Sequence, residues 1–436
     1  MQNKLSFEEA MDFLRDRTRF GCNLGLQRIE GLLKKLDNPH QKHIKYIHIG
    51  GTNGKGSTLA YLSKILQYNG YKVGTFISPH LHSYNERMCI NGQNIPEEKV
   101  AELITVIKPL LEEMEAEGSE PPTEFEVNTA MALLYFTNEN VDYAIMEVGL
   151  GGSIDSTNVI NPELSIITNV TMDHMDYLGE TITEIATVKA GIIKDNRPVI
   201  TGSRDNEVLE VIRNCAEKTN SEVIAIDTDF SWSERKVTGY MQEAQLAFNN
   251  SSLKFSTKML GKHQLDNAAM AIVASKLLGV YNDELTVRAV YDTVWQGRLE
   301  IMQNIPLVVI DGAHNVDGMK ALADAVKEYW QDNEIIAVLG MLADKEREKA
   351  LAKILPYISK AIITRVPNMR AGNWEVLAEI CRDHNVTVEL CEFVDDACEK
   401  GLNDLNELNN PNKMLLVTGS LYMIADARAY LLNKLK

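Results

Sequence analysis

Short apolar segments that end in small or polar residues alternate with helical patterns along almost the whole chain. The first series is KYIHIGG (45–51), KVGTFIS (72–78), YAIMEVGL (143–150), LSIITNV (164–170) and RPVITG (197–202), and the second is LVVIDGAH (307–314), IIAVLGM (335–341), AIITRV (361–366) and MLLVTGS (414–420). Continuous apolar strands of this kind are needed in a parallel sheet that helices cover on both faces. The pattern predicts an α/β fold with functional side chains where the strands end.

The length of the chain predicts two domains. Its 436 residues are more than one hydrophobic core usually serves. Between the two series of strands, residues 229–258 alternate polar and apolar side chains around the turn-like NNSS, which predicts an antiparallel hairpin. A helical pattern follows over 263–279. We place the domain boundary near residue 300, which gives domains 1–299 and 300–436.

Composition excludes several classes of partner. A formal charge of -17 argues against nonspecific binding to nucleic acid or to acidic membranes, because both need a basic surface. The six cysteines have no C-x-x-C pair and no zinc-like spacing, which favours buried thiols in a reducing compartment over a disulfide framework; they are Cys22, Cys89, Cys215, Cys381, Cys391 and Cys398. No segment has the run of about 18 uncharged apolar residues that a membrane span needs. We expect a cytoplasmic protein.

A glycine-rich turn in IHIGGTNGKGSTLAYLSKILQYNG (47–70) is the strongest local signal. A strand, the turn TNGKGS and a helix follow one another, and this arrangement directs backbone N–H groups and the helix dipole at phosphates. Lys55 is expected to reach the β- and γ-phosphates, and a hydroxyl of Ser57 or Thr58 to face magnesium. The loop differs from G-x-x-x-x-G-K-[ST] because Gly56 separates the lysine from the serine. The alternative is a plain glycine-rich turn.

The variant loop resembles that of the Mur ligases, and within them the family of folylpolyglutamate synthases and dihydrofolate synthases. Further segments stand in the order of that family: FISPHL (76–81), YNERMCINGQNI (84–95), TEFEVNTAMA (123–132), EVGLGGSIDSTNV (147–159), TNVTMDHMDYLGET (168–181), VKAGIIK (188–194), GKHQLDNAAMA (261–271), GRLE (297–300), DGAHNVDG (311–318) and TGSLY (418–422). The resemblance implies a nucleotide-binding N-terminal domain of the phosphate-loop ATPase type and a smaller, Rossmann-like C-terminal domain.

The resemblance also implies a magnesium site at the strand ends. Ser78 and Glu147 correspond to ligands of a first ion and His174 to a ligand of a second. Lys189 corresponds to a lysine that CO2 converts to a carbamate, which would add an anionic oxygen ligand. Taken alone, each has a common structural explanation: a turn cap, an ion pair, a structural histidine or a solvated lysine. With Lys55, the residues Glu147, His174 and Lys189 are the expected catalytic groups.

The implied ATP site combines the loop with residues from later segments. Its expected members are Asn53, Gly54, Lys55, Gly56, Ser57, Thr58, Asn267, Arg298, Asp311 and His314. Because Asp311 and His314 belong to the C-terminal domain, ATP is expected to lie between the domains, where domain closure would exclude water.

The implied folate site is carried by CNLGLQRI (22–29) and by a set of later residues, which are Thr123, Phe125, Glu126, Ser153 and Asp155. Phe125 could stack on a heteroaromatic ring or belong to the core. Three positions depart from the family pattern: Ser153 stands where an arginine is expected, Val188 where glutamate is common, and Val316, to which we attach little weight, where proline usually follows DGAHN. Serine cannot form the bidentate contact with a carboxylate that arginine forms.

Three functions are compatible with these motifs. The leading prediction is a ligase that joins L-glutamate to a reduced folate with ATP and Mg²⁺, acting as a monomer. The close alternative is dihydrofolate synthase, with dihydropteroate as acceptor, alone or in a bifunctional enzyme. The third is a non-catalytic ATP-binding paralogue, which only Ser153 and Val188 favour. A peptidoglycan Mur ligase fits less well, because SPHL, NER and DGAHN favour the folate branch.

Overall fold

The computed structural model describes residues 4–18, 21, 25–406 and 412–435. The chain divides into two compact units. Unit 1 comprises Met1–Arg235, Ala244–Ser256 and Asp266–Asp292, and unit 2 comprises Lys236–Glu243, Thr257–Leu265 and Thr293–Lys436. The boundary predicted at residue 300 stays a prediction.

Unit 1 is built on an eight-stranded sheet in the order β4-β3-β2-β5-β1-β6-β7-β8. The strands are β1 (Lys45–Gly50), β2 (Val73–Phe76), β3 (Met88–Ile90), β4 (Gln93–Asn94), β5 (Tyr143–Glu147), β6 (Leu164–Ile167), β7 (Val199–Thr201) and β8 (Val223–Ala225). From β2 to β8 all neighbours are parallel, whereas β3 and β4 form an antiparallel edge. The five strands predicted for this part are confirmed. The three that the sequence did not reveal have only two or three residues, too few for a periodic pattern.

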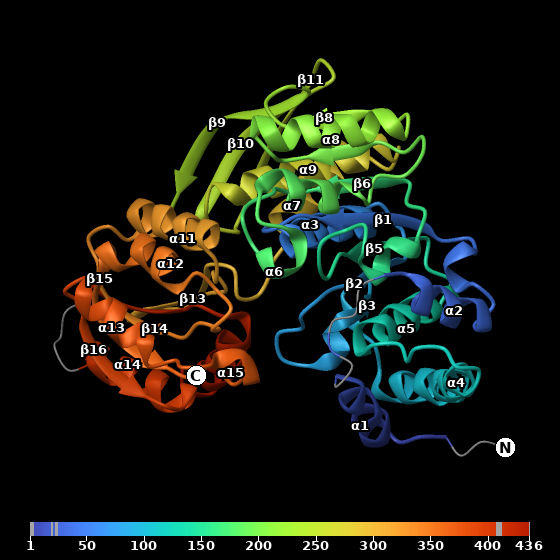
Figure 1. Cartoon of the computed structure of the whole chain (residues 1–436). Helices are drawn as coiled ribbons and strands as arrows, with labels where there is room; N and C mark the ends of the chain where they lie inside the picture. Colours follow the sequence, from blue (N-terminus) through green and yellow to red (C-terminus); the bar gives the residue numbers. More distant parts are fainter. Residues whose placement is uncertain (1–3, 19–20, 22–24, 407–411, 436) are drawn as a thin grey trace. The chain divides into compact units, whose positions relative to one another are not determined.

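Helices cover both faces of this sheet, as Figure 1 shows. They are α1 (Phe7–Arg17), α2 (Gln27–Lys35), α3 (Lys55–Tyr68), α4 (Glu97–Ala116), α5 (Glu124–Asn138), α6 (Met175–Leu178), α7 (Ile182–Ala190), α8 (Asn206–Lys218), α9 (His263–Leu277) and α10 (Asp283–Tyr291). On one face, Tyr46, Phe76 and Met146 share a core with α1, α2, α4 and α5. Alternation along the strands directs Ile47 and Ile49 to the opposite face. The parallel α/β fold predicted for this part of the chain is confirmed.

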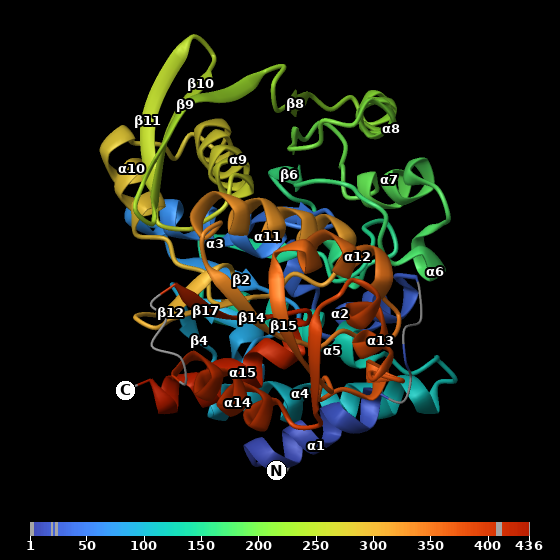
Figure 2. The ribbon, with the colours of Figure 1, turned by 90° about the vertical axis from the view of Figure 1, so that its left-hand side faces the viewer.

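A separate three-stranded sheet follows, in the order β11-β10-β9. Its strands are β9 (Phe230–Thr238), β10 (Met241–Phe248) and β11 (Ser251–Thr257), which lie side by side in Figure 2. The predicted NNSS turn is present, with Asn249 and Asn250 at φ 49° and 58°. The prediction of a single hairpin was incomplete, because a second turn at Gly239, with φ 58°, adds a third strand to the sheet. Two-residue connections of this kind join antiparallel strands.

Unit 2 has a six-stranded sheet in the order β12-β13-β17-β14-β15-β16. Its elements are β12 (Glu300–Asn304), β13 (Leu307–Asp311), α11 (Val316–Tyr329), β14 (Glu334–Leu339), α12 (Arg347–Ile354), β15 (Ile358–Thr364), α13 (Val376–Asp383), β16 (Thr387–Cys391), α14 (Val394–Asn406), β17 (Lys413–Thr418) and α15 (Leu421–Lys434). All neighbours are parallel except β12, which pairs antiparallel with β13. The four strands predicted here are confirmed, and β12 and β16 are additional.

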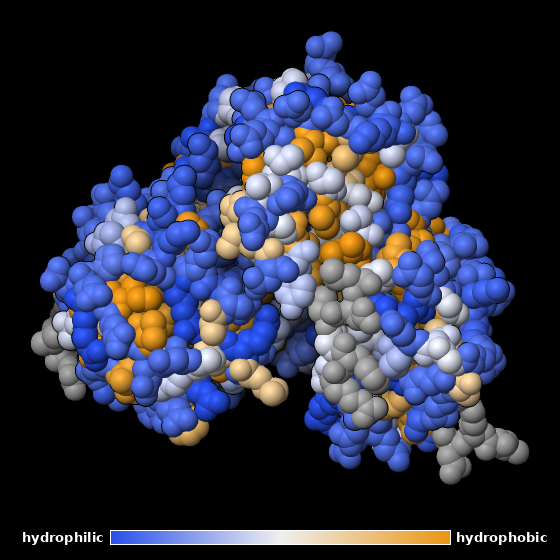
Figure 3. Space-filling view, in the orientation of Figure 1, coloured by the Kyte–Doolittle hydropathy of each residue, from blue (hydrophilic) through white to orange (hydrophobic). Residues whose placement is uncertain are grey.

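Hydrophilic side chains cover most of the molecular face drawn in Figure 3.

Short 3-10 helices lie between the longer elements, at Pro39–Gln41, Tyr84–Arg87, Ser156–Val159, Leu355–Tyr357 and Met369–Ala371. None of the helices in the described part of the chain is long and apolar enough to cross a bilayer.

Candidate active site

The glycine-rich turn connects β1 to α3 as predicted. Gly54 stands immediately before α3 in a left-handed conformation, φ 86°, which glycine adopts without strain. A Cβ at Gly54 would lie 2.5 Å from Oδ1 of Asn267, so the first turn of α9 is in close contact with the loop. Thr58 Oγ1 donates to the same Oδ1 at 3.3 Å. The structure therefore brings Asn267 to the loop.

Lys55 Nζ donates to carbonyl oxygens of its own loop. The acceptors are Gly51 O at 3.2 Å and Thr52 O at 3.1 Å. Lys189 Nζ donates to the same Gly51 oxygen at 3.0 Å. Two lysines that are far apart in sequence thus meet at one carbonyl group beside the phosphate loop.

Two residues that the sequence reasoning left without a role hold the loop in place. Asn169 Oδ1 accepts from Asn53 N at 2.8 Å, and its carbonyl accepts from Thr52 N at 2.9 Å. Thr168 Oγ1 donates to Asn53 O at 2.6 Å. Both directly follow β6, and small polar residues at the end of a parallel strand were the available signal.

The predicted metal ligands lie at the carboxyl edge of the sheet of unit 1. Glu147 ends β5, is buried, and accepts a hydrogen bond from Ser78 N, two residues beyond β2, at 3.3 Å. His174 follows β6 in a left-handed conformation, φ 53°, and its Nε2 lies 4.0 Å from Oδ1 of Asp173. No group of three or more His, Cys, Asp and Glu side chains that could share a metal ion occurs among the described residues. The predicted set would need Ser78 and Lys189 as well.

Lys189 is buried, although a lysine near a helix end usually faces solvent. It lies in the last turn of α7 and is 4% exposed. Burial, reinforced by the positive charge of Lys55, lowers its pKa from 10.5 to about 7, against the opposing effect of Asp173 and Asp155. The lowered pKa favours the neutral amine, the form in which a lysine can act as a nucleophile. Asp173, like Thr168 and Asn169, is a residue that sequence reasoning missed.

The segment 149–158 holds the end of α7 that carries Lys189. A Cβ at Gly152 would lie 2.6 Å from Val188 O and 2.7 Å from Lys189 O, so only glycine allows this approach. Ser153 N donates to Val188 O at 2.8 Å, and Asn158 Nδ2 donates to Gly191 O at 3.2 Å. Two of the positions that depart from the family pattern, Ser153 and Val188, are therefore direct neighbours. The Ser153 side chain is exposed.

Asp155 stabilises the segment 149–158 through hydrogen bonds to its carboxylate. Its buried carboxylate accepts from Leu150 N at 2.7 Å, from Thr157 N at 3.0 Å and from Thr157 Oγ1 at 2.5 Å. Burial raises its pKa, and these hydrogen bonds partly offset the rise. Both carboxylate oxygens are engaged by the loop.

His48, in the middle of β1, contacts this segment, and its burial leads us to expect that the stability of the protein depends on pH. Its Nε2 lies 2.8 Å from Thr157 Oγ1, and burial, with a smaller effect of Lys194, lowers its pKa from 6.5 to about 3. Between these values the unfolded chain binds a proton that the folded chain does not, so the free energy of unfolding should fall as pH falls from 6.5 to 3. Urea unfolding at several pH values should show a shallower fall in His48→Gln. Equal slopes in both proteins would contradict this assignment.

The predicted folate segments meet at the start of α5. Thr123 and Glu126 form a capping box, and Glu126 Oε2 also accepts from Arg28 Nε at 3.1 Å. Residues 22–24 of the segment 22–29 lie outside the described residues, whereas Arg28 is buried. The ring of Phe125 lies against Gly149, where a Cβ would be 2.4 Å from Cζ, and against Phe76 at 5.8 Å between ring centroids.

The predicted residues of unit 2 form one group. Asp311 ends β13 and accepts from Leu299 N at 2.9 Å and Ala313 N at 2.8 Å. Burial raises its pKa, and the charge of Arg298 opposes that rise. His314 Nδ1 lies 2.8 Å from Gly312 O. The structure thus brings Arg298, Asp311 and His314 together, and the placement of ATP between the domains stays a prediction.

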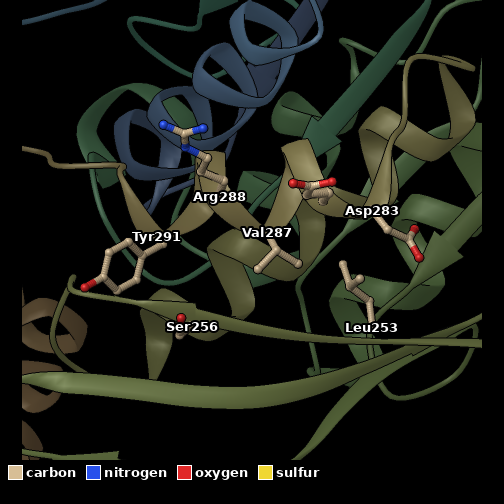
Figure 4. Close-up of a pocket in the computed structure, with 7 residues that line it drawn as sticks. Leu253, Ser256, Asp283, Val287, Arg288 and Tyr291 are labelled. Carbon is tan, nitrogen blue, oxygen red and sulfur yellow. The ribbon is translucent and has the colours of Figure 1, made fainter.

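An open surface pocket of about 570 Å³ lies elsewhere in unit 1, between β11 and α10 (Figure 4). Its lining residues are Leu253, Ser256, Asp283, Glu284, Val287, Arg288 and Tyr291. None of the predicted site residues lines it.

The fold and the phosphate loop define a Mur ligase. The Mur ligase middle domain matches residues 49–275, and the Mur ligase glutamate ligase domain matches residues 297–421. A dihydrofolate synthase/folylpolyglutamate synthase of Bacillus subtilis is 36% identical over 97% of this chain and 98% of its own length. The chain therefore belongs to the folylpolyglutamate synthase and dihydrofolate synthase family of Mur ligases, as its motifs predicted.

Solved structures agree with this assignment. The folylpolyglutamate synthase of Mycobacterium tuberculosis complexed with ADP is 29% identical, with a TM-score of 0.91 and 98% of both chains covered. The folylpolyglutamate synthase (FPGS) in a complex with AMPPCP and folate is 31% identical to this chain, with a TM-score of 0.85; the match covers 98% of this chain and 100% of that chain. The predicted two-domain α/β class is confirmed.

Proposed function

We propose that this protein uses ATP to attach L-glutamate to the γ-carboxyl group of a reduced folate. The observation that carries the proposal is the meeting of Lys55 and the buried Lys189 at one carbonyl of the phosphate loop. Such a site suits chemistry between anions, where charge neutralisation and positioning supply most of the rate. The names of the relatives support the same substrates.

The reaction would proceed in two steps. An oxygen of the folate γ-carboxylate attacks the γ-phosphorus of ATP, the bond to the β-phosphate oxygen breaks, and ADP leaves. The neutral amine of glutamate then attacks the carbonyl carbon of the acyl phosphate, and the tetrahedral intermediate expels phosphate and loses a proton. In this scheme the loop N–H groups and Lys55 hold the phosphates, and Lys189 lies beside them.

Magnesium would be held at the strand ends. Glu147 and Ser78 would hold a first ion through a buried carboxylate and a hydroxyl group, and His174 would hold a second through its imidazole. A hydroxyl group of Ser57 or Thr58 would face magnesium from the loop, and oxygen donors are those that Mg²⁺ prefers. A carbamate on Lys189 would add another oxygen ligand, and its lowered pKa favours the amine that reacts with CO2. When bound, the metal would neutralise charge on the phosphates.

The site residues further from the loop are proposed to bind substrates. We assign Asn267, Arg298, Asp311 and His314 to ATP. We assign the segment around Phe125 and Ser153 to folate, with Thr123, Glu126 and Asp155 shaping it through their hydrogen bonds within the protein.

Dihydrofolate synthase activity is the second candidate, because the Bacillus subtilis relative carries both names. The test is phosphate release and product mass with ATP, Mg²⁺ and L-glutamate, using tetrahydrofolate, methylenetetrahydrofolate and dihydropteroate in parallel. Extension of the folates alone supports a polyglutamate synthase, and extension of dihydropteroate supports a dihydrofolate synthase or a bifunctional enzyme. ADP binding without extension of any acceptor would favour the non-catalytic paralogue. We propose a cytoplasmic monomer.

Replacing Ser153 with Arg should lower KM for the acceptor about threefold or more, because guanidinium can pair with a carboxylate through two hydrogen bonds. The exposed position leaves room for the longer side chain. The measurement is KM for folate at saturating ATP and glutamate, with Ser153→Gln as the uncharged control. An unchanged KM in Ser153→Arg would show that this position does not contact the acceptor.

A further inference from the structure

A network of hydrogen bonds next to the proposed nucleotide site has no part in the function described so far. Asp266, in the first turn of α9, accepts two parallel bonds from Arg204, from NH1 to Oδ2 at 3.0 Å and from NH2 to Oδ1 at 2.9 Å. Trp232 Nε1 donates to Oδ1 of Asp266 at 2.8 Å. Arg204 Nε donates to Asp227 Oδ2 at 2.6 Å. We call these four residues the α9 bracket.

The α9 bracket joins three segments that are separate in sequence. Arg204 follows β7 by three residues, Asp227 precedes β9, and Trp232 lies within β9. Bidentate pairing between guanidinium and carboxylate fixes both distance and orientation, unlike a single lysine contact. The first turn of α9 is therefore fixed to the carboxyl edge of the sheet.

A second contact, one helical turn along α9, reinforces this attachment. A Cβ at Gly202 would lie 3.0 Å from Sδ of Met270 and 2.4 Å from Thr168 O, so the turn after β7 is packed tightly between α9 and the end of β6. Thr168 in turn binds Asn53 of the phosphate loop. The turn 202–204 thus contacts both α9 and the residue that supports the loop.

Asn267 is the residue whose position depends on this attachment. It directly follows Asp266, and its side chain contacts the phosphate loop at Thr58 and Gly54. Its Oδ1 occupies the space that a Cβ on Gly54 would need, so the amide lies directly against the loop. A small shift of the first turn of α9 would displace the amide from the loop.

We propose that Arg204 and Asp266 are positioning residues for the nucleotide: they fix Asn267 against the phosphate loop and so set the affinity for ATP. This inference rests on the proposed function, because it assigns the loop and Asn267 to ATP. Folate and glutamate binding are not expected to depend on the α9 bracket, because its four residues are not among those assigned to either substrate.

Unit 1 offers a control for Arg204 at the other end of β7. Arg197 lies just before β7 and pairs with Glu163 at 2.8 Å, with side chains 34% and 36% exposed. The Arg204 to Asp266 pair is similar, at 2.9 Å with 45% and 21% exposure. The two pairs differ in location, because Arg197 is at the amino edge of the sheet and Arg204 is at the carboxyl edge. Arg197 makes one bond to a carboxylate, whereas Arg204 makes three, so Arg197→Ala controls for the loss of a partly exposed, ion-paired arginine beside β7.

The experiment compares Arg204→Ala, Arg204→Lys and Arg197→Ala with the unmodified protein. We expect Arg204→Ala to raise KM for ATP about tenfold and to weaken ADP binding in calorimetry by a similar factor, with kcat and the KM for folate within about twofold. Arg204→Lys, which keeps the charge but loses the bidentate geometry, should show part of this effect. Arg197→Ala should leave ADP binding unchanged.

Two results would overturn the proposal. One is an equal effect of Arg204→Ala and Arg197→Ala on ADP binding, and the other is a uniform rise of KM for all three substrates in Arg204→Ala. Asp266→Asn provides a second variant if Arg204→Ala does not fold, and it should give the same selective loss. If the unmodified protein binds no ADP, the proposed function itself fails, which distinguishes that failure from failure of the positioning role alone.

Discussion

Replacing Lys189 with Ala is expected to lower the rate of glutamate ligation by about a hundredfold or more while the protein remains folded. Lys189 lies beside the phosphate loop, is 4% exposed and bonds to Gly51 O at 3.0 Å. Its replacement removes a group next to the proposed phosphate site and the nitrogen that CO2 would modify. The measurement is kcat for ATP-dependent extension of the folate, with the fold checked by circular dichroism.

The control is Lys218→Ala, because Lys218 is an exposed lysine at the end of α8. It occupies the same kind of helix-terminal position and should leave kcat unchanged. Adding a short-chain carboxylate such as acetate should partly restore activity to Lys189→Ala if a carbamate oxygen is needed. Loss without rescue would favour a role for the amine itself, and full activity of Lys189→Ala would remove this residue from the mechanism.

Replacing Lys55 with Met is expected to lower kcat/KM for ATP by about a hundredfold or more, because a phosphate site loses its cation. Lys55 Nζ donates to the carbonyl groups of Gly51 and Thr52, which lie within its own turn. ADP binding by calorimetry and steady-state kinetics with varied ATP measure the effect.

Lys64→Met is the matched control for Lys55→Met. Lys64 lies on the same helix, α3, with its Nζ 5.6 Å from the ring centroid of Tyr68. It carries the same charge and should leave ATP kinetics within about twofold of the unmodified protein if the effect is local. Equal losses in the two variants would mean that net charge, rather than the phosphate loop, controls nucleotide binding.

The core strands were predictable because strands buried on both faces must be continuously apolar, which needs no knowledge of the fold. The phosphate loop was predictable for a related reason. A turn such as TNGKGS between a strand and a helix has few structural uses, and Gly54 indeed adopts the left-handed conformation expected of such a turn. Family membership followed from the order of the motifs.

The hairpin region shows where pattern reasoning stopped short. Alternation over 229–258 predicted an antiparallel structure, but alternation does not reveal how many times the chain turns. The turn at Asn249 and Asn250 had a recognisable sequence, whereas the one at Gly239 rests on a single glycine. The structure therefore has three strands where the sequence predicted two.

The sequence by itself determined the α/β class, the phosphate loop and the family, because each depends on residues that are close together along the chain. Tertiary structure alone decided the burial and the lowered pKa of Lys189. The residues that surround it or shift its pKa lie elsewhere in the sequence; they are the loop at 51–55, Asp155 and Asp173. It also decided that Ser153 and Val188 are neighbours, and that Arg204 holds the helix that carries Asn267. Contacts between distant segments depend on how strands and helices pack, and that information is spread over the whole chain rather than written in any one motif.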